Sequence, residues 1–218
     1  MTLIVIGTHI VVLLGSCRYQ KIRGGKSITA ILIIFAKTIF TMTAIAHIPT
    51  VPRSLEEFTN WESNDGFKYE WNDGELIQFT GMKKRQYYVY TILNKLFAKK
   101  GYIETGTLMA EPDVMLTGIQ MRRPDIAYFT DRQVRDGRAG IDVIPAFVVE
   151  VISETDLIYK IEDKLTEYFK AGVQVVWNII PELQVVYVYT SRKNVKVCTE
   201  EDICSASPVL PEFDITVN

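Results

Sequence analysis

Cysteine and histidine are scarce in this sequence. Its 218 residues include three cysteines, Cys17, Cys198 and Cys204, and two histidines, His9 and His47. The cysteines form neither a disulfide framework nor a metal-ligand spacing, which favours a reducing compartment such as the cytoplasm. The histidines lie near the N-terminus and outside any cluster, which argues against a histidine metal site or a serine–histidine triad. If the chain is an enzyme, carboxylates and lysines must carry its chemistry.

Acidic residues are absent from residues 1–41, which carry five basic side chains. The rest of the chain has 19 basic and 26 acidic side chains, a formal charge of −7. A domain this acidic does not attract nucleic acid through its overall field. Any binding of nucleic acid would have to depend on local basic patches and on metal ions that offset the repulsion.

An apolar run long enough to cross a bilayer is also missing. Residues 3–15 are too few, and residues 28–46 are interrupted by Lys37. A secretory signal has basic residues before its apolar stretch, whereas here they follow it. We therefore expect Met42 to be the native start and residues 1–41 to be upstream sequence read in frame. The alternative is a membrane-inserted hairpin, which would make the protein membrane-associated.

From Met42 onward the apolar residues follow helical and strand spacings, without internal repeats. The spacing predicts a capped helix start at Ser54, helices over 82–99 and 157–171, and an exposed loop or short helix over 131–140. It predicts strands at 67–71, 75–79, 102–109, 124–129, 146–152, 173–180, 184–189 and 195–198, with a loop around Pro112 and Gly118. This order predicts one α/β or α+β domain, residues 42–218, with a mixed central sheet flanked by helices.

Glu150 is the most informative residue, because it interrupts the apolar strand at 146–152. A carboxylate in a strand buried on both faces has a large desolvation cost unless a cation or hydrogen bonds compensate for it. One interpretation is a buried glutamate with a protein partner. The other is a metal ligand, where a divalent ion compensates for the charge.

Three further residues are weaker candidates when taken alone. Asp125 follows Pro124 at the start of an apolar strand, and Glu75 lies just beyond a predicted hairpin turn. Lys164 lies on the flank of the apolar stripe of its predicted helix, about 60° from Ile161, from where its ammonium could reach the sheet. Lys160, one turn earlier, points further from that stripe.

Four segments share an order and spacing that is more specific than any one of them. They are residues 69–76, 123–127, 148–153 and 164–173. Together they resemble the PD-(D/E)xK nuclease superfamily and, within it, the Uma-two family of restriction endonucleases, over residues 42–218. The resemblance implies a restriction-endonuclease-like fold. The lysine expected two positions after the glutamate is Ile152 here, and in this family its role moves to the next helix, which favours Lys164.

The resemblance also implies a function. It predicts a metal-dependent endonuclease that hydrolyses phosphodiester bonds of nucleic acid, with DNA the expected substrate. Mg²⁺, or Mn²⁺ in its place, would be held by Asp125, Glu150 and the carbonyl of Val151, with Glu75 completing the shell. Lys164 would orient or help deprotonate the attacking water.

The sequence also offers candidate substrate contacts and a competing function. Arg122 and Arg123, beside Asp125, are the basic residues expected to touch the substrate, ahead of the runs at 83–85 and 99–100. Members of the superfamily often dimerise, and the sequence leaves a homodimer open. The competing interpretation is a catalytically inactive nucleic-acid-binding or regulatory module on the same fold, which Ile152 supports.

Overall fold

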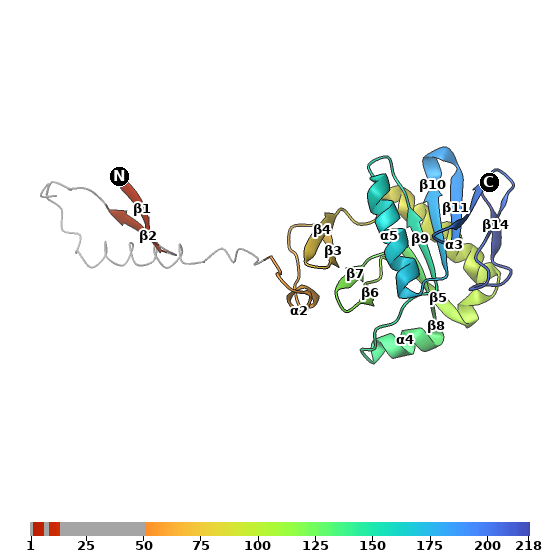
Figure 1. Ribbon diagram of the computed structural model, residues 1–218, viewed down its shortest axis with the longest axis horizontal. Coiled ribbons are helices and arrows are strands. Elements are labelled where there is room, and N and C mark those ends of the chain that lie inside the picture. Colours follow the sequence, from red (N-terminus) through yellow and green to blue (C-terminus); the bar gives the residue numbers. More distant parts are fainter. Residues whose placement is uncertain (1, 7–8, 14–50) are drawn as a thin grey trace, which may run out of the picture. The chain divides into compact units, whose positions relative to one another are not determined.

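The computed structural model describes residues 2–6, 9–13 and 51–218 (Figure 1). The chain divides into two units, Met1–Ile48 and Pro49–Asn218. In the first unit, β1 (Thr2–Ile6) and β2 (His9–Leu13) form an antiparallel hairpin. The expected start at Met42 and the apolar run at 28–46 lie outside the described residues. No described helix combines the length and the apolar character that a membrane crossing requires.

A six-stranded mixed sheet forms the centre of the second unit, as predicted. Its strand order is β12–β11–β10–β9–β8–β5, in which only β9 and β10 are parallel neighbours. The strands are β5 (Gly106–Ala110), β8 (Ile126–Thr130), β9 (Phe147–Val151), β10 (Val175–Ile180), β11 (Val185–Ser191) and β12 (Asn194–Thr199). All five residues of β9 are buried, which explains why this strand reads as a nearly continuous apolar run.

Helices cover both faces of this sheet. Phe97 of α3 (Lys84–Lys99) packs in one apolar cluster with Val149 of β9. Leu165 of α5 (Ile158–Ala171) packs in another cluster with Val148 of the same strand. Successive residues of a strand point to opposite faces, so α3 and α5 lie on opposite sides of the sheet. In Figure 1, α5 crosses the sheet on the side facing the viewer.

A smaller antiparallel sheet has the order β4–β3–β7–β6. Its strands are β3 (Lys68–Asn72), β4 (Glu75–Phe79), β6 (Val114–Thr117) and β7 (Gln120–Arg122). Phe58 of the short helix α2 (Leu55–Thr59) packs there against Trp71 and Met121. The side chain of Ser54 caps α2 by accepting a hydrogen bond from the N–H of Glu57, as the sequence predicted.

The structure corrects two expectations about the middle of the chain. Pro112 and Gly118 lie outside strands, as expected, but the segment also contains β6 and β7, which pair as a hairpin around Gly118 and were not predicted. The strand expected from residue 102 begins only at Gly106, after the 3₁₀ turn η1 (Tyr102–Glu104).

The remaining elements close the fold. Gly172 ends α5 with a left-handed φ of 106°, as expected for a residue just past a helix end. The expected exposed segment after β8 is the helix α4 (Asp131–Arg138), capped by Thr130. At the C-terminus β13 (Ile203–Ser205) and β14 (Asp214–Thr216) form an antiparallel pair. The segment that connects them contains Phe213. Phe213 is fully buried in the cluster under α3.

Candidate active site

Two acidic side chains on neighbouring strands line one cavity of about 530 Å³. Asp125 directly precedes β8, and Glu150 is the fourth residue of β9. The register pairs Ile126 with Val149, so Asp125 and Glu150 lie at the same level of the sheet. The N–H of Val151 donates a 2.7 Å hydrogen bond to Oδ2 of Asp125. The structure therefore brings together the three residues expected to hold a metal.

The carboxylate of Glu150 is held by two side chains of α5. The hydroxyl of Tyr168 donates to Oε1 of Glu150 over 2.5 Å, and Nζ of Lys164 lies 3.4 Å from the same oxygen. Residues four apart on a helix share a face, so one helix presents both groups to the strand. Lys164 therefore lies at the site for which the sequence nominated it, with its side chain 26% exposed.

A third carboxylate in this cavity, Glu70 of β3, was not selected from the sequence. Glu70 is 2% exposed, and its Oε1 lies 3.0 Å from Nζ of Lys164. It also accepts a 2.9 Å hydrogen bond from the N–H of Arg123. The signal that could have identified it is the one used for Glu150, because Glu70 is a carboxylate between Tyr69 and Trp71 in a predicted strand.

The structure does not bring Glu75 into the site. Glu75 is exposed beside the β3–β4 turn and is not among the residues that line the cavity. It pairs with Asn72, two residues from Glu70 along β3, which is about 7 Å at the rise of a strand. In the hairpin, Glu70 thus occupies the position that the sequence reasoning assigned to Glu75.

The two arginines before Asp125 have different environments. Arg122 is 3% exposed, and its guanidinium donates to Glu70 at 3.0 Å and to Glu167 at 2.6 and 2.9 Å. It is therefore engaged in an internal ion-pair network, contrary to the expectation that it would contact a substrate. Arg123 lines the cavity, and its Nε donates to Asp113 at 2.6 Å. Arg123 thus lies at the cavity with its guanidinium paired to Asp113.

Gln86, in the first turn of α3, is a second residue that the sequence reasoning missed. Its Nε2 donates to both carboxylate oxygens of Asp125 at 3.0 Å and to the carbonyl of Val151 at 3.3 Å. No local pattern distinguishes this glutamine from others on the helix. Its position becomes meaningful only once α3 is packed against the sheet.

The pKa values of the paired carboxylates are raised. Burial, followed by repulsion from Glu150, raises the pKa of Asp125 to about 7, although hydrogen bonds from Val151 and Gln86 oppose the shift. Burial also raises the pKa of Glu150, against the attraction of Lys164 and the hydrogen bond from Tyr168. Two buried carboxylates whose pKa values are both raised favour binding of a proton or a cation beside them.

Glu70 and Lys164, which form an ion pair at the site, are both stabilised in their charged forms. Burial alone would raise the pKa of Glu70, but the positive charges of Lys164 and Arg122 outweigh it and lower that pKa. Burial alone would lower the pKa of Lys164, but the charges of Glu150 and Glu70 outweigh it and raise that pKa. Lys164 is therefore a permanent cation at neutral pH.

The donor atoms at the cavity fit a hard divalent cation. Within residues 51–218, no three or more histidine, cysteine, aspartate or glutamate side chains meet as a metal-binding group. An ion held by Asp125, Glu150 and the Val151 carbonyl would thus keep several waters, as Mg²⁺ commonly does. Asn178 pairs with Glu150 in the parallel register and lines the cavity, and its buried Oδ1 has no partner among the described residues. Such an acceptor fits a water bound beside Glu150.

Comparisons with known proteins agree with this fold. The sequence model of the Uma2 family, described as "Putative restriction endonuclease", matches residues 55–218. A solved structure described as a "putative nuclease belonging to DUF820" from Anabaena variabilis superposes with a TM-score of 0.63 at 20% sequence identity, covering 76% of this chain and 96% of that one. Among curated proteins, none matches the chain. The family match spans most of the chain and all the residues of the cavity described above, and the chain therefore belongs to the Uma2 family.

Proposed function

We propose that this protein is a Mg²⁺-dependent endonuclease that hydrolyses phosphodiester bonds of DNA, with Mn²⁺ able to replace Mg²⁺. Membership of the Uma2 family and the nuclease-like fold support a nuclease function. The metal and the DNA substrate are the proposed part, and they rest on the chemistry of the cavity.

One observation carries the proposal. The β8–β9 register sets Asp125 beside Glu150, and Lys164 from α5 lies against Glu150 in the same cavity. Two carboxylates with raised pKa values next to a permanent cation can hold a divalent ion and a hydrolytic water together. A site built only to stabilise the fold would have no need for an open cavity at these residues.

A Mg²⁺ ion held by Asp125, Glu150 and the Val151 carbonyl would neutralise charge on the scissile phosphate and favour ionisation of a bound water. Gln86 holds the carboxylate of Asp125 through both oxygens, so it orients this ligand. Tyr168 does the same for Glu150. Hydrogen bonds of this kind hold the metal-binding carboxylates in position.

Lys164 orients the water and offsets developing negative charge. Its pKa is raised by Glu150 and Glu70, so its ammonium keeps its proton at neutral pH. Arg123 and Lys83 line the same cavity and are the basic residues that could contact the phosphate backbone of the substrate.

The test is cleavage by the full chain with Mg²⁺ or Mn²⁺. Supercoiled DNA, single-stranded DNA and RNA serve as separate substrates. Asp125→Asn and Glu150→Gln should each lower the cleavage rate at least a thousandfold, roughly the loss seen when essential catalytic groups are removed. Glu201→Gln, a neutralised carboxylate that is exposed and far along the sequence from the site, is the matched control and should cleave normally.

The outcomes distinguish a nuclease from an inactive nucleic-acid-binding module and from a contaminating activity. Loss of cleavage in both site variants, with circular dichroism retained and thermal midpoints no lower than in the wild type, supports the nuclease. Equal cleavage by all variants identifies a contaminant and overturns the proposal. Absence of cleavage with either metal, together with DNA binding, overturns it in favour of the inactive binding module. Cleavage of RNA alone replaces DNA as the substrate.

A further inference from the structure

The outer face of α3 is an exposed stripe that nothing in the proposed mechanism uses. Six side chains at helical spacing form it, and all six are exposed: Lys84, Tyr88, Thr91, Ile92, Lys95 and Lys99. At 100° per residue they fall within one third of the helix circumference. Leu93 and Phe97, 3% and 1% exposed, lie on the opposite side against the sheet. These six residues form the α3 stripe.

The charge of this region contrasts with that of the domain. Residues 83–100 contain six basic side chains and no acidic one, whereas the rest of residues 42–218 contains 13 basic and 26 acidic side chains. Almost a third of the positive charge of the domain is therefore concentrated on one helix and its two flanking residues. A polyanion repelled by the rest of the surface would be attracted here.

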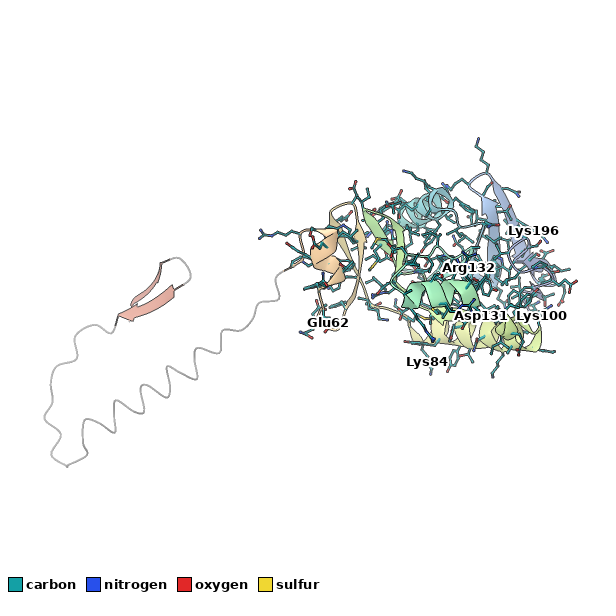
Figure 2. The ribbon with its side chains drawn as sticks, turned by 90° about the horizontal axis from the view of Figure 1, so that it is seen from below. Glu62, Lys84, Lys100, Asp131, Arg132 and Lys196 are labelled. Atoms are coloured by element: carbon teal, nitrogen blue, oxygen red, sulfur yellow. The ribbon has the colours of Figure 1, made fainter. Side chains whose placement is uncertain are left out.

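The three lysines of the α3 stripe are available for a partner. Within residues 51–218, none of Lys84, Lys95 and Lys99 forms an ion pair with a carboxylate. Lys84 lies over the ring of Tyr88, 5.9 Å from its centroid, which keeps the ammonium on the outer surface. Figure 2 labels Lys84 in the first turn of α3 and Lys100 just past its last turn, so the two labels bound the stripe.

The stripe begins beside the catalytic cavity. Gln86 in the first turn of α3 contacts Asp125, and Lys83, which precedes the helix, lines the cavity. From Lys84 to Lys99 the helix rises about 22 Å at its normal pitch. That length matches roughly six base-pair steps of a duplex. A strand leaving the cavity past Lys83 would reach the first turn of α3, where the stripe begins.

We propose that the α3 stripe binds the sugar–phosphate backbone of the nucleic acid on one side of the cleavage site. The lysines contact phosphates, while Tyr88 and Ile92 pack against sugars. This inference rests on the proposed nuclease function, because the occupant of the stripe is the substrate of that site. A second copy of the chain is the competing occupant, since its acidic surface would also complement the lysines.

The experiment compares two double variants of the full chain. Lys95→Gln/Lys99→Gln removes two charges from the stripe. Lys170→Gln/Lys193→Gln removes two exposed charges elsewhere, and Lys170 matches Lys99 in lying in the last turn of its helix. Binding to a duplex of about two helical turns is measured by fluorescence anisotropy without divalent metal, at salt concentrations between about 50 and 200 mM. Cleavage with Mg²⁺ is measured on the same samples.

The stripe variant should bind DNA at least tenfold more weakly at low salt. The negative slope of log affinity against log salt should become shallower by about 2, because each lost phosphate contact removes about 0.9 from its magnitude. The control double variant should keep most of the wild-type slope. If the wild-type protein cleaves DNA, and the stripe variant binds DNA with the affinity and salt slope of the wild type, the stripe proposal is overturned and the nuclease proposal stands. A dimer that dissociates in the stripe variant with no change in slope would assign the face to a second copy. Failure of the wild-type protein both to bind and to cleave would overturn both proposals.

Discussion

Nζ of Lys164 lies 3.0 Å from Oε1 of Glu70, and this ion pair joins α5 to the smaller sheet. The same ammonium is 3.4 Å from Oε1 of Glu150 on the central sheet. One lysine thus compensates two buried carboxylates from separate sheets. The position of its ammonium at the cavity depends on both, so changes at any of the three residues should affect the others.

Replacing Lys164 by methionine should lower kcat about a hundredfold or more, because a preorganised positive group at the reacting phosphate is lost. Lys160→Met is the matched control, since Lys160 lines the same cavity from the same helix but forms no ion pair within residues 51–218. Single-turnover cleavage measures both. A comparable loss in Lys160→Met, or normal turnover in Lys164→Met, would contradict the role assigned to Lys164.

Glu70 and Glu75, on the two strands of one hairpin, offer a direct comparison. Glu70→Gln should lower kcat and shift the alkaline limb of the pH–rate profile to lower pH, because Lys164 loses one of the two charges that raise its pKa. Glu75→Gln should behave like the wild type, because Glu75 is exposed and outside the cavity. The reverse result would restore Glu75 as the acidic residue of the site. A fall in thermal midpoint without a shift of the profile would leave Glu70 a purely structural role.

The fold was largely predictable because its signals are local. The apolar run around Glu150, the helical spacing before Gly172 and the hairpin turn at residues 72–74 each depend on neighbouring residues. The β6–β7 hairpin was not predicted, because its strands are short and lie within the segment expected to be a loop. Short strands give too few alternations to be distinguished from irregular chain.

The site was predictable only in part for a related reason. Asp125, Glu150 and Lys164 come from segments that the family resemblance already aligned. Glu70 lies in such a segment too, as a carboxylate inside a predicted strand, but its contact with Lys164 appears only when the smaller sheet packs against α5. Gln86 reaches the cavity only when α3 is packed against the central sheet. The same packing removed Arg122 from the surface, because Glu70 and Glu167 engage it on two sides.

Arg122 should therefore matter for stability. Arg122→Met leaves Glu70 without one of its two cations and Glu167 without its partner, and loss of one member of a buried ion pair costs about 3–5 kcal/mol. Arg123→Met should cost about 1 kcal/mol or less, because its partner Asp113 is 54% exposed. Urea unfolding compares the two variants. Similar free energies of unfolding for both would show that the Arg122 network is not a main support of the fold.

Asp125 makes the stability of the metal-free protein depend on pH. Its pKa is raised to about 7 by burial and by repulsion from Glu150, whereas an unfolded aspartate titrates at about 3.9. Between these values the folded protein keeps a proton that the unfolded chain has released, so the free energy of unfolding falls as pH rises through this window. A shift of about three units corresponds to at most about 4 kcal/mol.

Asp125→Asn removes this titration, because an amide stays neutral at every pH in the window. With a chelator present, the variant should melt above the wild type near pH 8, and the gap should close as the pH falls below about 4, where Asp125 becomes protonated in both states. Added Mg²⁺ should raise the midpoint of the wild type and not that of the variant, because a bound cation stabilises only the form that holds it. Parallel pH profiles for the two proteins would contradict the raised pKa. A raised pKa without any response to Mg²⁺ would instead mean that the carboxylate pair is satisfied by a proton alone, and the metal would have to be removed from the proposed mechanism.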